Sequence, residues 1–277
     1  MKLIVIFISL NAFYLDCIGQ GKNAIWCFGD SAGIDFNNVA NPIVFSSGMN
    51  AVGSCASISD SSGNLKFYCS TPDITNYWNG VLPLGVVFNN EHHKMVNGDS
   101  LNCIAWYHEM IIVPDPGDTN LFYIFHIGVT NLYGLYYSVI DMSLDSGRGA
   151  VISKNNQLRN EVAVDCLQAI KHGNGRDWWV IFKQAQPSNN EFYMYSITTN
   201  GIALDHIDSV GLNGSSNAGD LRFNSTGSQF AFCNWPGLLA LYDFVRCTGI
   251  ITLINTIRPE DPNVNYPYFF DCCFSPN

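Results

Sequence analysis

Short apolar and aromatic runs alternate with polar turns along most of the chain, and four segments share one plan. They are SCASISDSSGNLKFYCS, EMIIVPDPGDTNLFYIFHI, CLQAIKHGNGRDWWVIFKQ and DLRFNSTGSQFAFCN. Each has an apolar run, a polar turn and an aromatic-rich run, and the turns are centred on Gly63, Gly117, Gly175 and Gly227. Apolar runs bounded by Gly, Asn, Asp and Ser predict β-hairpins.

The hairpins recur at a nearly constant interval. The first apolar residues after the turns are spaced by 56, 57 and 52 residues and are Leu65, Leu121, Trp178 and Phe230. A second strand–turn–strand unit follows, and its first strands begin near Leu135, Phe192 and Leu239. In the first repeat the segment GVVFNN takes this place. Each unit of roughly 50 residues therefore predicts four short strands.

Repeated four-stranded sheets predict an all-β fold, because stacking such sheets around an axis buries the faces that one sheet leaves exposed. We expect a β-propeller with about four four-stranded blades. The closing segment FDCCFSPN predicts the first strand of a fifth blade, so the ring is incomplete. The alternative is a β-sandwich of sixteen unrelated strands, which requires no periodic repetition. The segment LRNEVAVDCLQAI, which comes nearest to helical periodicity, is interpreted as a linking loop followed by an inner strand.

The N-terminus predicts a secretory signal peptide over residues 1–19, followed by a partial propeller domain over residues 20–277. Lys2 precedes the apolar run Leu3 to Leu10, which is too short to span a bilayer. We therefore expect a secreted or outer-surface protein with no integral membrane span after signal removal. A lipid anchor on Cys17 is the weaker alternative, because Asp16 fits that signal poorly.

Composition limits the partners and the cysteine chemistry. The net charge is −10, and such a surface repels phosphate backbones, so no nucleic-acid partner is expected. Of the ten cysteines, nine remain after Cys17, and no C-x-x-C spacing occurs. We interpret them mainly as small buried apolar residues, with one or two disulfides left possible for an exported chain.

Nine motifs along the chain resemble, in order, the N-terminal β-propeller region of large exported Bacteroidetes surface proteins. They are NAIWCFGDSAGIDFN, ISDSSGNLKFY, GVVFNNEHHKMVNG, IIVPDPGDTNLFYIF, GLYYSVIDMSLDSGRG, AIKHGNGRDWWVI, FYMYSITTNGI, LRFNSTGSQFA and FSPN. The resemblance implies WD40-like or YVTN-like propeller blades, and a gliding-motility-associated sorting domain used by type IX secretion in the longer relatives. It implies no catalytic residue set. The chain departs from the family in its extra segment between Cys69 and Gly85 and in where it stops.

No local motif assigns a catalytic, cofactor or metal site. G-x-S-x-G and phosphate-binding glycine loops are absent, and His108-Glu109 lacks the second histidine of a zinc-protease helix because position 112 is Ile. His126 and His172 are interpreted as structural histidines. Aromatic residues in polar segments are the candidate ligand contacts, namely Tyr77, Trp78 and Trp235.

The sequence therefore predicts a non-catalytic binding or scaffold domain whose partner is a surface protein or a glycan. The alternative is a polysaccharide-acting hydrolase or lyase with its site in the propeller channel. That activity requires two carboxylates within about 10 Å on the channel side. Asp165, Asp177 and Asp220 are candidates that the sequence alone cannot place. A third possibility is a gene fragment with no independent role.

Overall fold

The chain forms antiparallel β-sheets throughout the part that can be described. The computed structural model describes residues 21–51, 53–71, 84–103, 108–128, 134–185, 190–213, 218–235, 237–257, 269 and 271–275. Within these residues there are eighteen strands, two short 3-10 helices (Gly21–Asn23 and Asp145–Gly147) and no α-helix. None of the helices in this part of the chain has the length and apolar character needed to cross a bilayer.

The strands form five sheets, each running in chain order from its first strand to its last. Sheet 1 contains β1 (Ile25–Phe28), β2 (Asp30–Asp35) and β3 (Ile43–Asn50). Sheet 2 contains β4 (Cys55–Ser59), β5 (Leu65–Ser70) and β6 (Val86–Asn89). Sheet 3 contains β7 (Met110–Pro114), β8 (Leu121–Gly128), β9 (Gly134–Asp141) and β10 (Ala150–Gln157).

Sheets 4 and 5 complete the described fold. Sheet 4 contains β11 (Gln168–Lys171), β12 (Trp178–Lys183), β13 (Glu191–Thr198) and β14 (Gly201–Ser209). Sheet 5 contains β15 (Gly219–Phe223), β16 (Gln229–Asn234), β17 (Leu238–Phe244) and β18 (Ile251–Ile257). The predicted hairpins and the repeat interval are therefore confirmed from sheet 2 onward.

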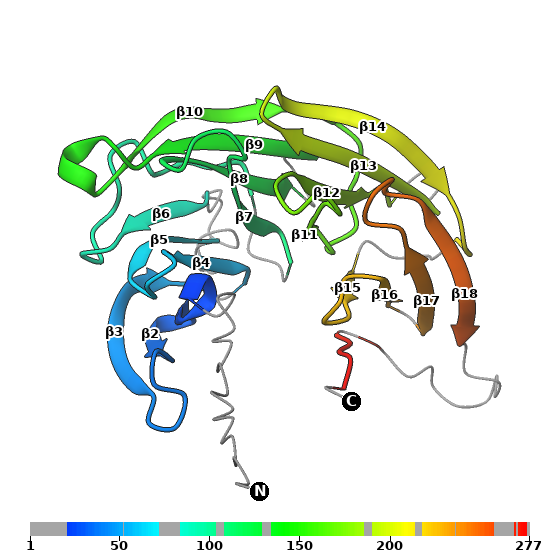
Figure 1. The fold of residues 1–277 in the computed structure, drawn as a ribbon, viewed down its shortest axis with the longest axis horizontal. Coiled ribbons are helices and arrows are strands. Elements are labelled where there is room, and N and C mark those ends of the chain that lie inside the picture. The colour runs from blue at the N-terminus through cyan, green and yellow to red at the C-terminus, as the bar shows by residue number, and fades with distance from the viewer. Residues whose placement is uncertain are drawn as a thin grey trace, which may run out of the picture.

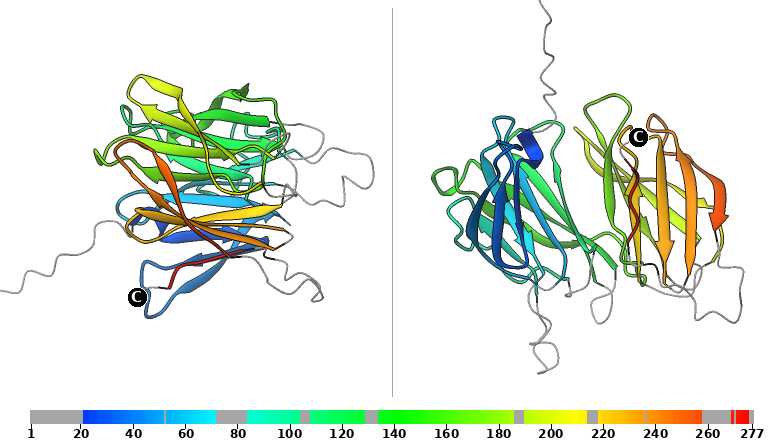
Figure 2. Two further views of the ribbon diagram at one scale, coloured as in Figure 1. Left: turned by 90° about the vertical axis from the view of Figure 1, so that its right-hand side faces the viewer. Right: turned by 90° about the horizontal axis from the view of Figure 1, so that it is seen from below.

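The five sheets stand side by side in an arc (Figure 1). The first strand of each sheet lies on the inner side of the arc and the last strand on the outer side, as β7 and β10 illustrate. Inner strands of consecutive sheets contact one another along the whole series. The arc is open between sheets 1 and 5, which lie apart when the molecule is seen from below (Figure 2). This arrangement is β-propeller-like.

A separate apolar core lies at each of the four junctions between consecutive sheets. Met49 of sheet 1 packs with Tyr68 of sheet 2 at the first junction. At the second, Phe67 meets Phe122 edge-on with ring centroids 5.3 Å apart. Phe125 and Phe182 share the third core. Phe192 and Phe230 share the fourth core, which lies between sheets 4 and 5. A sandwich would bury one core between two layers, so this serial burial excludes the sandwich alternative.

The turn between the first and second strands is built in the same way in sheets 2 to 5. A side-chain oxygen accepts hydrogen bonds from backbone N–H groups a few residues later. Asp60 accepts from Ser62 and Asn64 at 2.8 and 2.9 Å. The equivalent acceptors are Asp115, Asn174 and Asn224. The interpretation of these polar segments as turns is confirmed.

Replacing Gly175 with alanine is expected to destabilise the protein by about 1 kcal/mol. Gly175 has a φ of 74°, and an added Cβ would meet no atom within 4 Å, so backbone strain alone sets the cost. Gly175→Asn is the matched variant, and it should cost less because asparagine tolerates this conformation better. Chemical denaturation measures both. Equal losses for the two variants would contradict this assignment of the cost.

Sheet 2 has three strands among the described residues, where four were predicted, and two further features differ from the sequence-based expectation. Residues 25–50 form a complete three-stranded sheet, so the structure has five sheets where four blades and one strand were expected. In sheet 1, β2 is joined to β1 through Gly29, without the polar turn that marks the other sheets. The described residues 271–275, expected to begin a fifth blade, run beside β15 without strand pairing (Figure 1).

Candidate functional site

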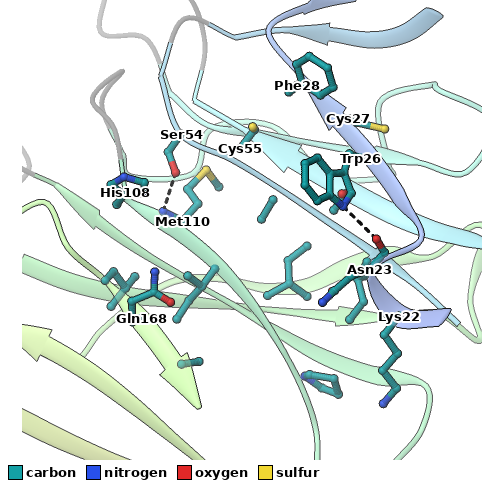
Figure 3. A pocket seen from close by; sticks show the side chains of 18 of the residues that line it. Lys22, Asn23, Trp26, Cys27, Phe28, Ser54, Cys55, His108, Met110 and Gln168 are labelled. Carbon is teal, nitrogen blue, oxygen red and sulfur yellow. Dashed lines mark hydrogen bonds between the residues drawn. The ribbon is translucent and has the colours of Figure 1, made fainter. Parts of the chain in front are cut away.

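The inner strands of the arc line a cavity of about 860 Å³. β1, β4, β7 and β11 each contribute lining residues, and sheet 5 contributes Arg222. Trp26 and Phe28 lie along one side, with His108, Met110 and Gln168 across from them (Figure 3). Trp26 is 53% exposed and its indole N–H donates to the backbone carbonyl of Asn23 at 2.9 Å. The cavity therefore has a mixed lining, in which apolar and polar side chains surround an accessible aromatic ring.

A cluster of ionisable side chains stands at the His108 end of this cavity. Asp220 and Arg222 lie two residues apart on β15, so they point to the same face. The Arg222 Nε donates to Asp220 Oδ2 at 3.0 Å, and His108 Nε2 lies 3.2 Å from Asp220 Oδ1. Asp271 lies 3.5 Å from Arg222 Nε. We call these four residues, His108, Asp220, Arg222 and Asp271, the charged cluster.

The side chains of the charged cluster range from fully buried to exposed. Asp220 is 0% exposed, whereas the Asp271 side chain is 64% exposed. His108 and Arg222 lie between these extremes and are the two members that line the cavity. A small molecule in the cavity would therefore meet the imidazole and the guanidinium, with Asp220 held behind them.

Backbone contacts hold His108 in this place. Its N–H donates to Asp165 Oδ1 at 2.6 Å, and its carbonyl accepts from the Leu167 N–H at 3.1 Å. Asp165 is itself buried and forms a parallel bridge with Ala218, next to β15. The segments that lead into β7, β11 and β15 thus fix one another, and the imidazole is positioned against Asp220.

Burial sets the protonation states within the charged cluster. Burial, and then the hydrogen bond with Asp271, raise the pKa of Asp220 to about 7, although Arg222 acts in the opposite direction. Burial and the Arg222 charge lower the pKa of His108 to about 4. For Asp271 burial acts to raise the pKa, but Asp220 and Arg222 outweigh it and lower the pKa. At neutral pH the imidazole is therefore uncharged, Asp271 is ionised, and Asp220 is ionised in part of the molecules.

Three members of the charged cluster carry side chains that can bind a metal ion. Three possible ligand atoms lie within 4.8 Å of one another, one each from His108, Asp220 and Asp271. Arg222 already contacts Asp220 at 3.0 Å and His108 Nε2 at 3.2 Å. A guanidinium at this distance repels a cation, so we interpret the group as an ion-pair cluster. The sequence-based expectation of no metal and no cofactor stays a prediction.

The shifted pKa of Asp220 predicts a pH-dependent stability difference between the wild type and Asp220→Asn. The carboxyl keeps its proton to about pH 7 when folded but loses it near pH 4 when unfolded, so wild-type stability falls as the pH rises between these values. Asp220→Asn lacks this loss, so its melting temperature should rise relative to the wild type from pH 4 to pH 8. His108 has the opposite slope but remains in both proteins. A pH-independent difference in melting temperature would contradict the raised pKa.

The structure separates the residues singled out from the sequence. Asp220 and Asp165 lie at the inner side of the arc, whereas Asp177 lies in the β11–β12 turn, where its carboxylate pairs with Arg176 at 2.8 Å. Trp235 is 38% exposed in the turn after β16 and is not among the residues that line the cavity. Tyr77 and Trp78 lie outside the described residues. His126 is a buried structural histidine, hydrogen-bonded to Asn102 O and Ser138 Oγ, as expected.

Sequence reasoning missed His108, Arg222 and Asp271. His108 was considered only as part of a helical zinc motif, and Asp271 only as part of an incipient strand. The three residues and Asp220 come from segments far apart in the chain, so no local spacing joins them. One signal in the sequence could have found them: each lies at or beside the innermost strand of a sheet, and the repeat shows where the innermost strand of each unit falls.

Comparisons with known proteins show the fold only. No family model matches the chain, and no curated protein matches it. The chain is similar to a periplasmic gluconolactonase of Pseudomonas aeruginosa, with 12% identity and a TM-score of 0.52, over 83% of this chain and 64% of that one. It is also similar to a functionally unknown protein from Desulfotomaculum acetoxidans, with 9% identity and a TM-score of 0.49, over 85% of this chain and 66% of that one. The chain thus spans just under two thirds of the length of these proteins.

Taken together, the serial sheets, the inner-strand cavity and the gluconolactonase likeness define a β-propeller-like protein with a charged cluster at its inner face.

Proposed function

We propose that this protein is a hydrolase that opens a small lactone or ester of a polar, sugar-like acid at its inner face. The observation that carries the proposal is the His108–Asp220 pair, with an Nε2–Oδ1 distance of 3.2 Å, beside Arg222 at the wall of the cavity. A neutral imidazole next to a buried carboxyl can accept a proton from water, and the adjacent cation can bind a developing oxyanion.

The proposed reaction uses each group at a stated atom. A water attacks the carbonyl carbon of the substrate, and Nδ1 of His108 accepts the proton of that water, because Nε2 faces Asp220. Arg222 donates hydrogen bonds to the carbonyl oxygen as it becomes negative. The bond to the ring oxygen then breaks, and the imidazolium returns its proton to that oxygen. Water is thus divided between a carboxylic acid and an alcohol, and Asp220 stabilises the transient charge on His108.

Burial of Asp220 favours acyl hydrolysis over glycoside hydrolysis. A glycosidase requires one carboxyl group to protonate the leaving oxygen directly and a second to face the sugar ring. Asp220 has a pKa raised to about 7, which suits an acid, but it is fully buried and reaches the cavity only through His108 and Arg222. Lactone hydrolysis needs only one group to carry the proton in and out. The similarity to a gluconolactonase suggests the first substrate to test.

A substrate panel tests the proposal. The full chain is incubated with gluconolactone-type lactones, simple aryl esters and neutral polysaccharides, and the acid released is followed by a pH indicator. We expect turnover of at least one lactone or ester above the spontaneous rate, and no release of reducing sugar from the polysaccharides. Turnover of a polysaccharide alone would replace this proposal with the glycan hydrolase or lyase alternative.

A non-catalytic binding role at the same cavity is the second candidate, and the accessible Trp26 ring favours it. Aromatic faces stack on sugars, and Trp26 is 53% exposed at the cavity. Binding of a glycan or a surface protein without turnover, weakened by Trp26→Ala, would support this role. Trp235, away from the cavity, is the matched control position for that substitution.

We further propose that the protein is exported, with removal of residues 1–19, and that it belongs with the surface propellers that its motifs resemble. The short apolar run after Lys2 supports export. N-terminal sequencing of the protein recovered from the growth medium or cell envelope tests it, and an uncleaved cytoplasmic product would contradict it.

A further inference from the structure

The C-terminal segment carries a cysteine that lies against the innermost strands of sheet 5. The Cys272 N–H donates to Asp220 Oδ2 at 3.4 Å, and the Cys272 thiol lies 3.8 Å from the same oxygen and 3.7 Å from the carbonyl oxygen of Ala231. These contacts place its sulfur over the stretch of β16 that ends near Cys233.

Cys233 is the cross-strand partner of Asp220, so its side chain belongs to the same face of sheet 5 as the charged cluster. It is fully buried, and the influence of Cys272 lowers the pKa of its thiol. Both cysteines therefore lie beside Asp220, one on a rigid strand and the other on the adjoining segment, so a small adjustment would bring their sulfurs to bonding distance.

We propose that Cys233 and Cys272 form a disulfide, a covalent site that fastens residues 271–275 to β16 and holds Asp271 in the charged cluster. The inference does not rest on the hydrolase proposal.

Among the described residues, no other cysteine contacts this pair in that way. Cys69, Cys103 and Cys166 are buried among apolar residues in the junction cores. Cys273 is exposed and so is Cys247, which lies in the turn after β17. Cys273 differs from Cys272 by one position and therefore presents its side chain differently. It serves as the matched control.

The bond forms by thiol–disulfide exchange with a small-molecule disulfide such as oxidised glutathione. Cys272 is the partly exposed member of the pair, so it reacts first, although its contact with Cys233 and burial raise its pKa. It loses its proton and attacks one glutathione sulfur, forming a mixed disulfide and releasing one glutathione thiol. The Cys233 thiolate then attacks the Cys272 sulfur and releases the second. Two protein thiols are oxidised and one glutathione disulfide is reduced to two thiols. The hydrogen bond from Cys272 lowers the pKa of Cys233, which favours the resolving thiolate there.

Peptide mapping of the full chain tests the proposal. The protein is equilibrated with oxidised glutathione, its free thiols are alkylated under denaturing conditions, and it is cleaved after Arg222 and before Asp243 and Asp271. These cuts separate Cys233 from Cys247 and isolate Cys272 with Cys273. We expect one linked pair of peptides, 223–242 with 271–277. The link should persist in Cys273→Ser and disappear in Cys272→Ser.

Thermal unfolding gives a second, independent reading. A bond that closes a loop of roughly 40 residues is expected to raise the melting temperature by on the order of 10 °C on oxidation in the wild type and in Cys273→Ser. No rise is expected in Cys272→Ser, whose change lies at a partly exposed position and should leave folding intact. Full alkylation of Cys233 and Cys272, a bond between Cys272 and Cys273, or a bond to any other cysteine would overturn the proposal.

Discussion

Replacing His108 with glutamine is expected to lower kcat/KM for lactone hydrolysis by about 1,000-fold, while leaving KM nearly unchanged. Glutamine keeps a polar side chain at the cavity wall but cannot accept and return a proton. Asp220→Asn should lower kcat by a similar factor, because it leaves the transient imidazolium without its counter-charge. Initial rates on the best substrate of the panel, with the wild type at equal concentration, measure both effects.

Controls separate this role from a structural one. His93→Gln changes a histidine whose side chain is 77% exposed outside the cavity, and Asp243→Asn changes an exposed carboxylate on β17. Both should retain wild-type rates. In His108→Gly, added imidazole should restore part of the activity, which a merely structural histidine would not allow. Undiminished turnover in His108→Gln would show that the His108–Asp220 pair takes no part in the reaction.

Asp220 is expected to support activity while lowering stability, and one variant can test both effects. Its raised pKa means that the folded protein holds the ionised carboxyl unfavourably above pH 7. Asp220→Asn should therefore lose activity without losing melting temperature at pH 8. Residues that lower the free energy of unfolding are found preferentially at functional sites.

The repeat made most of the fold predictable. Strand β12 begins at Trp178 and β8 at Leu121, as the spacing of apolar residues indicated, because one hairpin geometry with one polar turn recurs in each sheet. Sheet 1 could not be found in this way. Its hairpin turns at Gly29 without an Asx acceptor, so its strands do not match the motif that defines the other units.

The candidate site was only partly predictable, for a topological reason. The carboxylates singled out from the sequence included Asp220. Its role depends on its burial and on its contacts with His108 and Asp271, which lie 112 residues before it and 51 residues after it. A propeller-like arc brings innermost strands together irrespective of sequence distance. Residue spacing therefore carries information within one sheet and very little between sheets.

Replacing Phe230 with alanine is expected to destabilise the protein by about 3–5 kcal/mol. The Phe230 ring is fully buried in the core between sheets 4 and 5, stacked on Tyr242 at 4.8 Å and edge-on to Phe192 at 5.8 Å. The loss is comparable to much of the total stability of an ordinary domain. Urea denaturation measures it, and Leu204→Ala, at a half-exposed position on β14, is the control with an expected loss below about 0.5 kcal/mol.

The way in which Phe230→Ala unfolds tests the serial architecture itself. Each core joins two consecutive sheets, and sheet 5 lies at one end of the arc (Figure 1). Its stability is therefore expected to depend on the junction with sheet 4 more than on the rest of the molecule. Hydrogen exchange should show lost protection in β16 and β17 while β5 and β8 keep theirs. Equal loss of protection in all five sheets would mean that the arc unfolds as one cooperative unit, and that its cores are coupled beyond nearest neighbours.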